Sequence, residues 1–126
     1  MTDHITLTLP RERSFFGVAR LVLGGLATRL DVTVECLEGL ELALDGLLHR
    51  ADGAEEITVA LDVADGALTA SVGPFRGDDV RNELEGAPGD SISLRRLLDT
   101  VVDGYQASHR DDGTWVELRK SIERAA

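Results

Sequence analysis

The stretch LELALDGLLHRA, residues 40–51, predicts a helix and also contains the weakest position of that helix. Leu40, Leu44 and Leu47 recur at steps of four and three, so they share one helix face and predict its burial in a core. Gly46 stands among them, although glycine inside a helix costs about 1 kcal/mol relative to alanine. The stretch then ends in a His-Arg pair where an apolar helix would have continued. A glycine kept inside a helix despite this cost indicates that the surroundings or the function of that position require it.

Length and charge limit the class of protein. The chain has 126 residues, which suits one domain spanning residues 1–126. A formal net charge of −10 disfavours nucleic acid as a partner, because phosphate backbones select faces rich in Lys and Arg. No apolar run reaches membrane-spanning length and no signal peptide is visible, so we expect no membrane partner. Cys36 is the only cysteine and cannot form an internal disulfide, which favours a cytoplasmic protein.

Hydrophobic periodicity predicts elements in the order β-α-α-β-β-lid-α-β-β. Asp65-Gly66 is a strong signal for a two-residue hairpin between the second and third strands. We therefore expect an α+β fold, a two-layer α/β sandwich whose mainly antiparallel sheet has helices on one face. The predicted strands are residues 5–9, 57–63, 68–72, 105–109 and 114–118, and the predicted helices are residues 14–30, 33–50 and 91–101.

Two segments carry more specific expectations. Ser14 is expected to cap the first helix, and Asp31 or Thr33 the second. In residues 73–90 the periodicity fails and Gly, Pro, Asp, Asn and Glu accumulate, which predicts a mobile lid-like loop with room for a short helical turn near Val80–Leu84. The expected buried stripe of the first helix is Phe15, Val18 or Ala19, Val22 and Leu26.

Standard catalytic constellations are absent from the sequence. The three histidines, at positions 4, 49 and 109, show no metal-ligand spacing, so we expect no metal site and no catalytic residue. Cys36 is expected to be a small core residue, and Ser91 and Ser93 to be helix caps rather than nucleophiles. Trp115 lies on the polar side of the last strand. It is either an exposed anchor for a partner or packed under the strand of Tyr105.

Three stretches, taken in order, resemble a known family. Leu42-Ala43-Leu44-Asp45 is similar to that family's L-A-V-S/D, and the segment from Ser93-Leu94 to Val101-Val102-Asp103 is similar to its G-L helix ending in V-D. DGTWVELRK, residues 112–120, is similar to its D-G-G-T-x-V-x-L-x-K. Together with the order of elements, nearly the whole chain resembles the GHKL-type (Bergerat) ATPase fold of RsbW/SpoIIAB-like anti-sigma factor serine kinases. That fold is related to the ATPase domains of histidine kinases and Hsp90.

The family's nucleotide motifs are degraded in this chain. Its second helix carries Glu-x-x-x-Asn, in which Glu activates a nucleophile and Asn holds Mg²⁺; Gly46 and Arg50 stand at these places. Gly46 has no side chain for the task, and Arg50 repels a cation although it could contact a phosphate.

The two glycine motifs also depart from the family pattern. The adenine-reading Asp-x-Gly-x-Gly falls on residues 73–77, Gly-Pro-Phe-Arg-Gly, which lack that acid. The phosphate lid Gly-x-Gly-x-Gly falls on residues 89–93, Gly-Asp-Ser-Ile-Ser, which keep one glycine. The resulting vestigial nucleotide pocket comprises Gly46, Arg50, Gly73, Pro74, Gly89, Ser91 and Ser93.

The resemblance and these losses together imply a degenerate regulatory module that binds proteins, with anti-sigma-like regulation of transcription, no ATP hydrolysis and no cofactor. Its partners would be a sigma factor, an STAS-type anti-anti-sigma protein or a second copy of itself. The alternative is a divergent ATP-binding anti-sigma serine kinase that uses ATP and Mg²⁺, with Arg50 on a phosphate. In an unrelated α/β sandwich, Gly46 and Arg50 would be ordinary residues.

Overall fold

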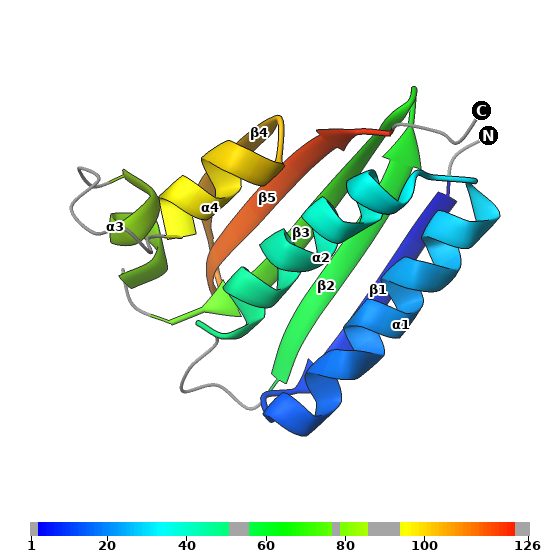
Figure 1. Cartoon of the computed structure of the whole chain (residues 1–126). Coiled ribbons are helices and arrows are strands. Elements are labelled where there is room, and N and C mark those ends of the chain that lie inside the picture. Colours follow the sequence, from blue (N-terminus) through cyan, green and yellow to red (C-terminus); the bar gives the residue numbers. More distant parts are fainter. Residues whose placement is uncertain (1–2, 51–55, 77–78, 86–93, 123–126) are drawn as a thin grey trace.

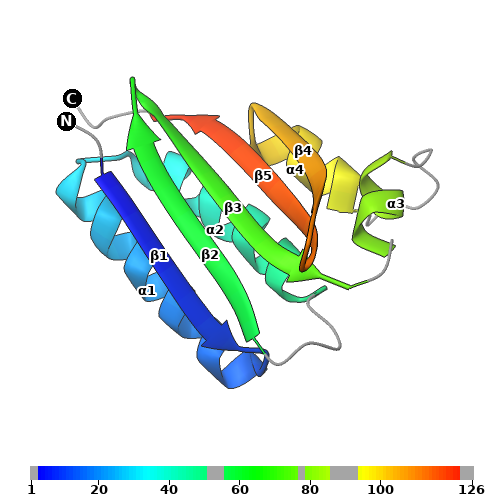
Figure 2. The ribbon, with the colours of Figure 1, turned by 180° about the vertical axis from the view of Figure 1, so that it is seen from behind.

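The computed structural model describes residues 3–50, 56–76, 79–85 and 94–122, and it has two layers (Figure 1). Helices α1, α2 and α4 lie on one face of an antiparallel sheet, and no described helix covers the other face (Figure 2). The predicted α+β sandwich is therefore confirmed. The strands are β1 (Asp3–Pro10), β2 (Glu56–Ala64), β3 (Ala67–Phe75), β4 (Gly104–Arg110) and β5 (Gly113–Ser121), and the helices are α1 (Arg13–Arg29), α2 (Val34–Leu48), α3 (Asp79–Glu85) and α4 (Leu94–Val101).

The sheet has the strand order β1-β2-β3-β5-β4, and each neighbouring pair is antiparallel. The β2–β3 turn confirms the predicted hairpin, because Asp65 and Gly66 both have positive φ values, 53° and 75°, as a two-residue turn of this kind requires. The β4–β5 hairpin pairs with β3 through β5. The chain between β3 and β4 contains α3 and α4; α4 packs against α2, and α3 packs against α4 (Figure 1).

Helix α2 forms the centre of the core. Leu40, Leu44 and Leu47 are buried as predicted, and Cys36 is buried with them. Of the two proposed caps, Thr33 is the one used, since its hydroxyl accepts a hydrogen bond from the Cys36 amide at 3.2 Å. The sequence thus predicted both the start and the buried face of this helix correctly.

The predicted buried face of α1 was correct in part, since Ala19 and Leu26 are buried as expected. The helix begins at Arg13 after Glu12, whose side chain makes no capping bond, so Ser14 is not the cap. Phe15 is 40% exposed and its neighbour Phe16 is buried in its place, because adjacent residues of a helix point about 100° apart. The residues buried on α1 are Phe16, Ala19, Leu23, Leu26 and Ala27.

The segment predicted as a lid-like loop contains regular structure. Gly73, Pro74 and Phe75 are the last residues of β3, and Phe75 is buried, so the expected loop boundary at residue 73 was wrong. The short helical turn predicted near Val80–Leu84 is confirmed as α3. Residues 77–78 and 86–90 lie outside the described residues, so the mobility of this segment stays a prediction.

Among the described segments, no helix combines the length and the hydrophobicity that crossing a lipid bilayer requires.

Candidate functional site

Gly46 lies where α4 packs against α2. A Cβ atom at this glycine would be 2.6 Å from Cδ2 of Leu97 and 3.4 Å from Cδ1 of Leu94. Any side chain at position 46 would therefore have to displace Leu97, which occupies the space beside the helix. The glycine that weakens α2 by its low helix propensity thus permits the close approach of α4.

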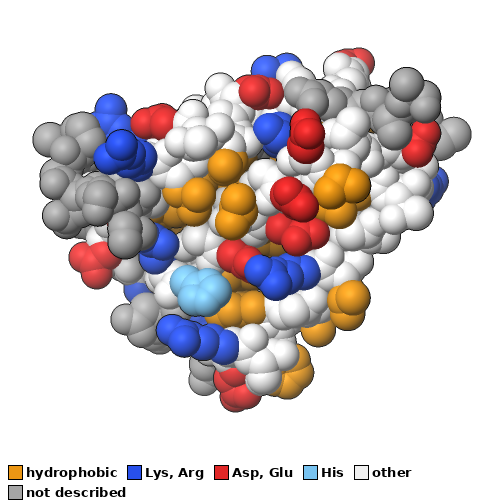
Figure 3. Space-filling model, viewed as in Figure 1, with side chains coloured by type: hydrophobic (Ala, Val, Ile, Leu, Met, Phe, Trp, Pro, Cys, Tyr) orange, Lys and Arg blue, Asp and Glu red, His pale blue; other side chains and the backbone are white. Residues whose placement is uncertain are grey.

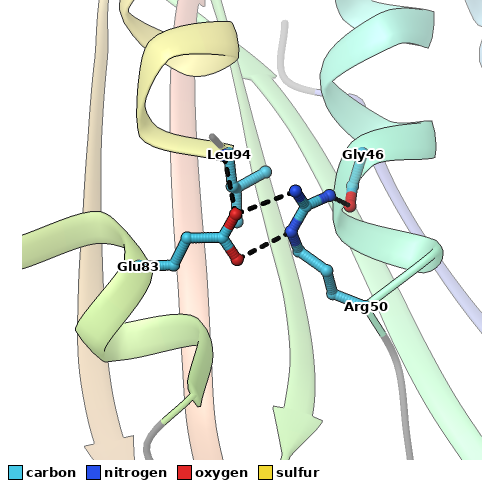
Figure 4. A network of polar contacts seen from close by, with 4 residues as sticks. All are labelled: Gly46, Arg50, Glu83 and Leu94. Atoms are coloured by element: carbon cyan, nitrogen blue, oxygen red, sulfur yellow. Dashed lines mark hydrogen bonds and ion pairs between the residues drawn. The ribbon is translucent and has the colours of Figure 1, made fainter. Parts of the chain in front are cut away.

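Arg50 lies two residues after the end of α2, and each of its three guanidinium nitrogens donates a hydrogen bond to a neighbouring group (Figure 4). Nε donates to Oε2 of Glu83 and Nη2 donates to Oε1 of Glu83, both at 2.8 Å. Nη1 donates to the backbone carbonyl of Gly46, also at 2.8 Å. The pairing with Glu83 is bidentate, the geometry in which guanidinium and carboxylate interact most strongly.

Glu83 connects this arginine to a third helix. It lies on α3, and its Oε1 also accepts a hydrogen bond from the amide of Leu94, the first residue of α4, at 2.8 Å. The hydrogen bond from Arg50 lowers the pKa of Glu83 below its ordinary value, and the bond from the Leu94 amide adds to that effect. We call Gly46, Arg50, Glu83 and Leu94 the Arg50 network; it joins α2, α3 and α4.

The sequence did not single out Glu83. It lies 33 residues from Arg50, and no motif spacing links the two. The only available signal was the acidic residue on the helical turn predicted near Val80–Leu84, which says nothing about where that turn packs.

The residues around Arg50 do not fit the Mg²⁺ ion that the family resemblance implies. Magnesium is held by carboxylate or carbonyl oxygens, whereas the place of the family's Asn carries a cation here. Glu83, the carboxylate beside it, is already paired with that cation. Within the described ranges, no group of three or more His, Cys, Asp or Glu side chains is placed to hold a metal ion.

Gly73 and Pro74 serve the sheet rather than a ligand. A Cβ atom at Gly73 would come within 2.6–3.0 Å of ring atoms of Trp115, so only glycine lets that ring lie on β3. The Pro74 carbonyl accepts a hydrogen bond from Arg11. The structure therefore joins Gly46 to Arg50 but places Gly73 with Trp115. Gly89, Ser91 and Ser93, the remaining predicted pocket residues, lie outside the described residues.

Trp115 is not an exposed anchor. It is 9% exposed, its Nε1 donates to Asp112 at 2.8 Å, and the Arg110 guanidinium lies 4.3 Å from the ring centroid. Its ring lies against Gly73 of β3 and against Arg110 of β4, the strand of Tyr105, so of the two expectations the packed one agrees with its burial. A partner-binding role for Trp115 stays a prediction, and a partner here would meet Arg110 first.

A search against models of protein families finds no match. Individual proteins do match, and over most of their length. The serine-protein kinase RsbW of Bacillus mycoides (strain KBAB4) is 24% identical over a 144-residue alignment that covers 97% of this chain and 87% of that protein. The serine-protein kinases RsbW of Bacillus cereus (strain B4264) and Bacillus anthracis are 22% and 24% identical with the same coverage. In sequence along nearly its whole length, and in an architecture consistent with the GHKL sandwich, this chain is a distant relative of the RsbW-type serine-protein kinases.

Proposed function

We propose that this chain is a regulatory module of the RsbW type that acts by binding other proteins, without hydrolysing ATP or transferring its phosphate. The observation that carries this proposal is the pairing of Arg50 with Glu83. A cation stands at the position where the family holds Mg²⁺, and its donors are directed at Glu83 and at the Gly46 carbonyl. Phosphoryl transfer relies on a bound metal and positioned donors, and this corner supplies neither.

The packing at Gly46 and the sequence of residues 73–77 support the same conclusion. The catalytic acid of the family would start from position 46, where Leu97 already occupies the adjacent space. The acid that reads adenine is absent from residues 73–77, where neither Gly73 nor Pro74 has a side-chain hydrogen-bonding group. Two separate parts of a nucleotide site are therefore missing, besides the metal position.

The helix-covered surface supports binding to a protein. Acidic side chains gather near the middle of this face in Figure 3, and apolar side chains lie around them. Leu21 of α1 and Leu42 of α2 are both more than half exposed. Apolar contact positions with charged neighbours are typical of protein interfaces. From the family resemblance, the expected partner is a sigma factor or an STAS-type anti-anti-sigma protein in the bacterial cytoplasm, and a second copy of the chain is the other candidate.

A divergent serine kinase is the second candidate function, because the matched relatives are named serine-protein kinases. In this chain it would use ATP and Mg²⁺ and would require Arg50 to leave Glu83 and contact a phosphate. That exchange would break the two hydrogen bonds of 2.8 Å between Arg50 and Glu83. Binding of ATP by a kinase would therefore carry an energetic cost that binding of a protein partner would not.

Calorimetric titration with Mg-ATP distinguishes the two functions. We expect no measurable heat of binding, and also none for the double variant Gly46→Glu/Arg50→Asn, because residues 73–77 still lack the adenine-reading acid. Dissociation constants in the micromolar range for the wild-type chain would contradict the proposal and favour the kinase. Binding by the double variant alone would mean that residues 73–77 are not the adenine segment.

Co-purification from the native cells tests the partner class. A tagged chain should retain a sigma factor or an STAS-type protein. A Leu21→Asp/Leu42→Asp variant is the matched control, because both side chains are exposed and the change should weaken capture without unfolding the chain. Capture of neither class would contradict the partner assignment.

A further inference from the structure

Two positive groups converge on one oxygen atom of Glu83. Oε1 accepts a hydrogen bond from Nη2 of Arg50 and another from the backbone amide of Leu94, each at 2.8 Å. The first amide of a helix has no partner inside the helix and carries part of the positive end of the helix dipole. A guanidinium and a helix-terminal amide that point at one place form the donor set of an anion site.

We propose that Glu83 is a built-in anionic ligand, whose carboxylate fills an anion site made by Arg50 and the first amide of α4 and so holds α3 and α4 against α2. This inference rests on these contacts alone and does not depend on the proposed function. It explains how the corner is fixed in a chain whose residues do not fit the family's metal-bound nucleotide.

The network differs from the other ion pairs among the described residues. Arg81–Glu85 lies within α3 and Arg95–Asp99 within α4, so each joins side chains of a single helix. Arg20–Asp45 joins α1 to α2. The Arg50–Glu83 pair instead joins the end of α2 to α3 and, through Leu94, to α4. Its side chains are 28% and 30% exposed, so solvent screens the pair less than the two intrahelical pairs.

Removal of the Glu83 carboxylate should leave the site intact but empty. Arg50 would keep its bond to the Gly46 carbonyl. Its Nη2 and the amide of Leu94 would still point at the place that Oε1 of Glu83 now occupies. A half-buried cation and an unpaired helix amide are both stabilised by an anion. A small carboxylate from solution should therefore take the place of the missing side chain.

Thermal unfolding of Glu83→Ala in acetate tests this inference. We expect the variant to lose about 5–10 °C in Tm, and we expect sodium acetate to restore at least about 2 °C more than sodium chloride at equal ionic strength. The wild type and Glu85→Ala, a change at an exposed residue of the same helix, should show no such difference. The double variant Arg50→Met/Glu83→Ala should also ignore acetate, because it lacks the guanidinium.

An unchanged Tm in Glu83→Ala, or an equal response to acetate in the double variant, would overturn the proposal. If Glu83→Ala does not fold, Glu83→Gln provides the test, since it keeps an oxygen for the Leu94 amide but loses the ion pair. Amide hydrogen exchange in α4 should then be about tenfold faster than in the wild type, with exchange in β2 unchanged. Unchanged exchange in α4 would reject the inference. None of these measurements uses nucleotide. A result that rejects this inference therefore leaves the proposed function untouched.

Discussion

Two arginine–carboxylate pairs meet helix α2, and they differ in what else they contact. Arg20 of α1 pairs with Asp45 through Nε and Nη2, and Arg50 pairs with Glu83 through the same two nitrogens. Arg20 is 52% exposed and its pair links two helices. Arg50 is less exposed than Arg20, at 28%, although Asp45 is less exposed than Glu83. The Arg50 pair also binds the Gly46 carbonyl and the first amide of α4. Similar pairing geometry thus supports a simple surface contact in one region and a three-helix junction in the other.

The three-helix junction depends on the packing of α4 against α2 at Gly46. The substitution Gly46→Glu should disrupt that packing more than any other change considered. The new side chain must displace Leu97 and carry a charge into the α2–α4 contact, so we expect a loss of about 3 kcal/mol in the free energy of unfolding. Urea denaturation measures this loss.

Gly46→Ala is the matched control for that variant. The gain of about 1 kcal/mol in helix propensity should roughly offset the small shift required of the flexible Leu97 side chain. Equal stability of the Gly46→Glu variant and the wild type would mean that α4 is not fixed against α2.

Replacing each arginine by methionine compares the two pairs directly. Arg50→Met leaves Glu83 without its cation, and we expect a loss of about 2 kcal/mol in the free energy of unfolding. Arg20→Met removes an exposed partner of Asp45, whose own side chain is 19% exposed, and should produce a smaller loss than Arg50→Met. Chemical denaturation of both variants in one buffer provides the comparison. Equal losses would show that the third contacts of Arg50 add nothing.

Acid should remove the contribution of Glu83 gradually. Its folded pKa lies below the ordinary value of 4.5, so the stabilisation is fully present above pH 4.5 and is lost as the pH falls through the folded pKa. The stability difference between wild type and Glu83→Gln, about 1 kcal/mol at neutral pH, should therefore shrink between pH 6 and pH 3. Unfolding titrations across that range measure it. A difference that grows toward acid would reverse the sign assigned to this pair.

The sequence predicted those parts of the fold where one local pattern dominates. Leu40, Leu44 and Leu47 form a single stripe on α2, and Asp65-Gly66 suits only a tight turn. Part of the buried face of α1 was misassigned because apolar residues occur in adjacent pairs, such as Phe15 and Phe16 or Val22 and Leu23, which create two competing stripes. Only the sheet beneath the helix decides between them.

The sequence predicted only those residues of the candidate site that align with a motif of the family. Gly46 and Arg50 were found by resemblance, and the structure brings them into contact. Glu83 was not found, because its pairing depends on how α3 packs rather than on spacing. The sequence left Trp115 undecided between an exposed and a packed position, because its contact with Gly73 becomes visible only when β3 extends through Phe75.

Trp115 and Tyr105 can serve as two separate optical reporters, because they lie on opposite faces of the sheet. Val116 points into the core, so its neighbour Trp115, the only tryptophan, lies on the sheet face that no described helix covers. The only tyrosine, Tyr105, packs against the core side and donates a hydrogen bond to Asp99 of α4 at 2.6 Å. Tryptophan fluorescence should therefore follow the sheet, while the tyrosine absorbance band follows the docking of α4. Without any added label, spectroscopy can separate detachment of that helix from unfolding of the whole chain.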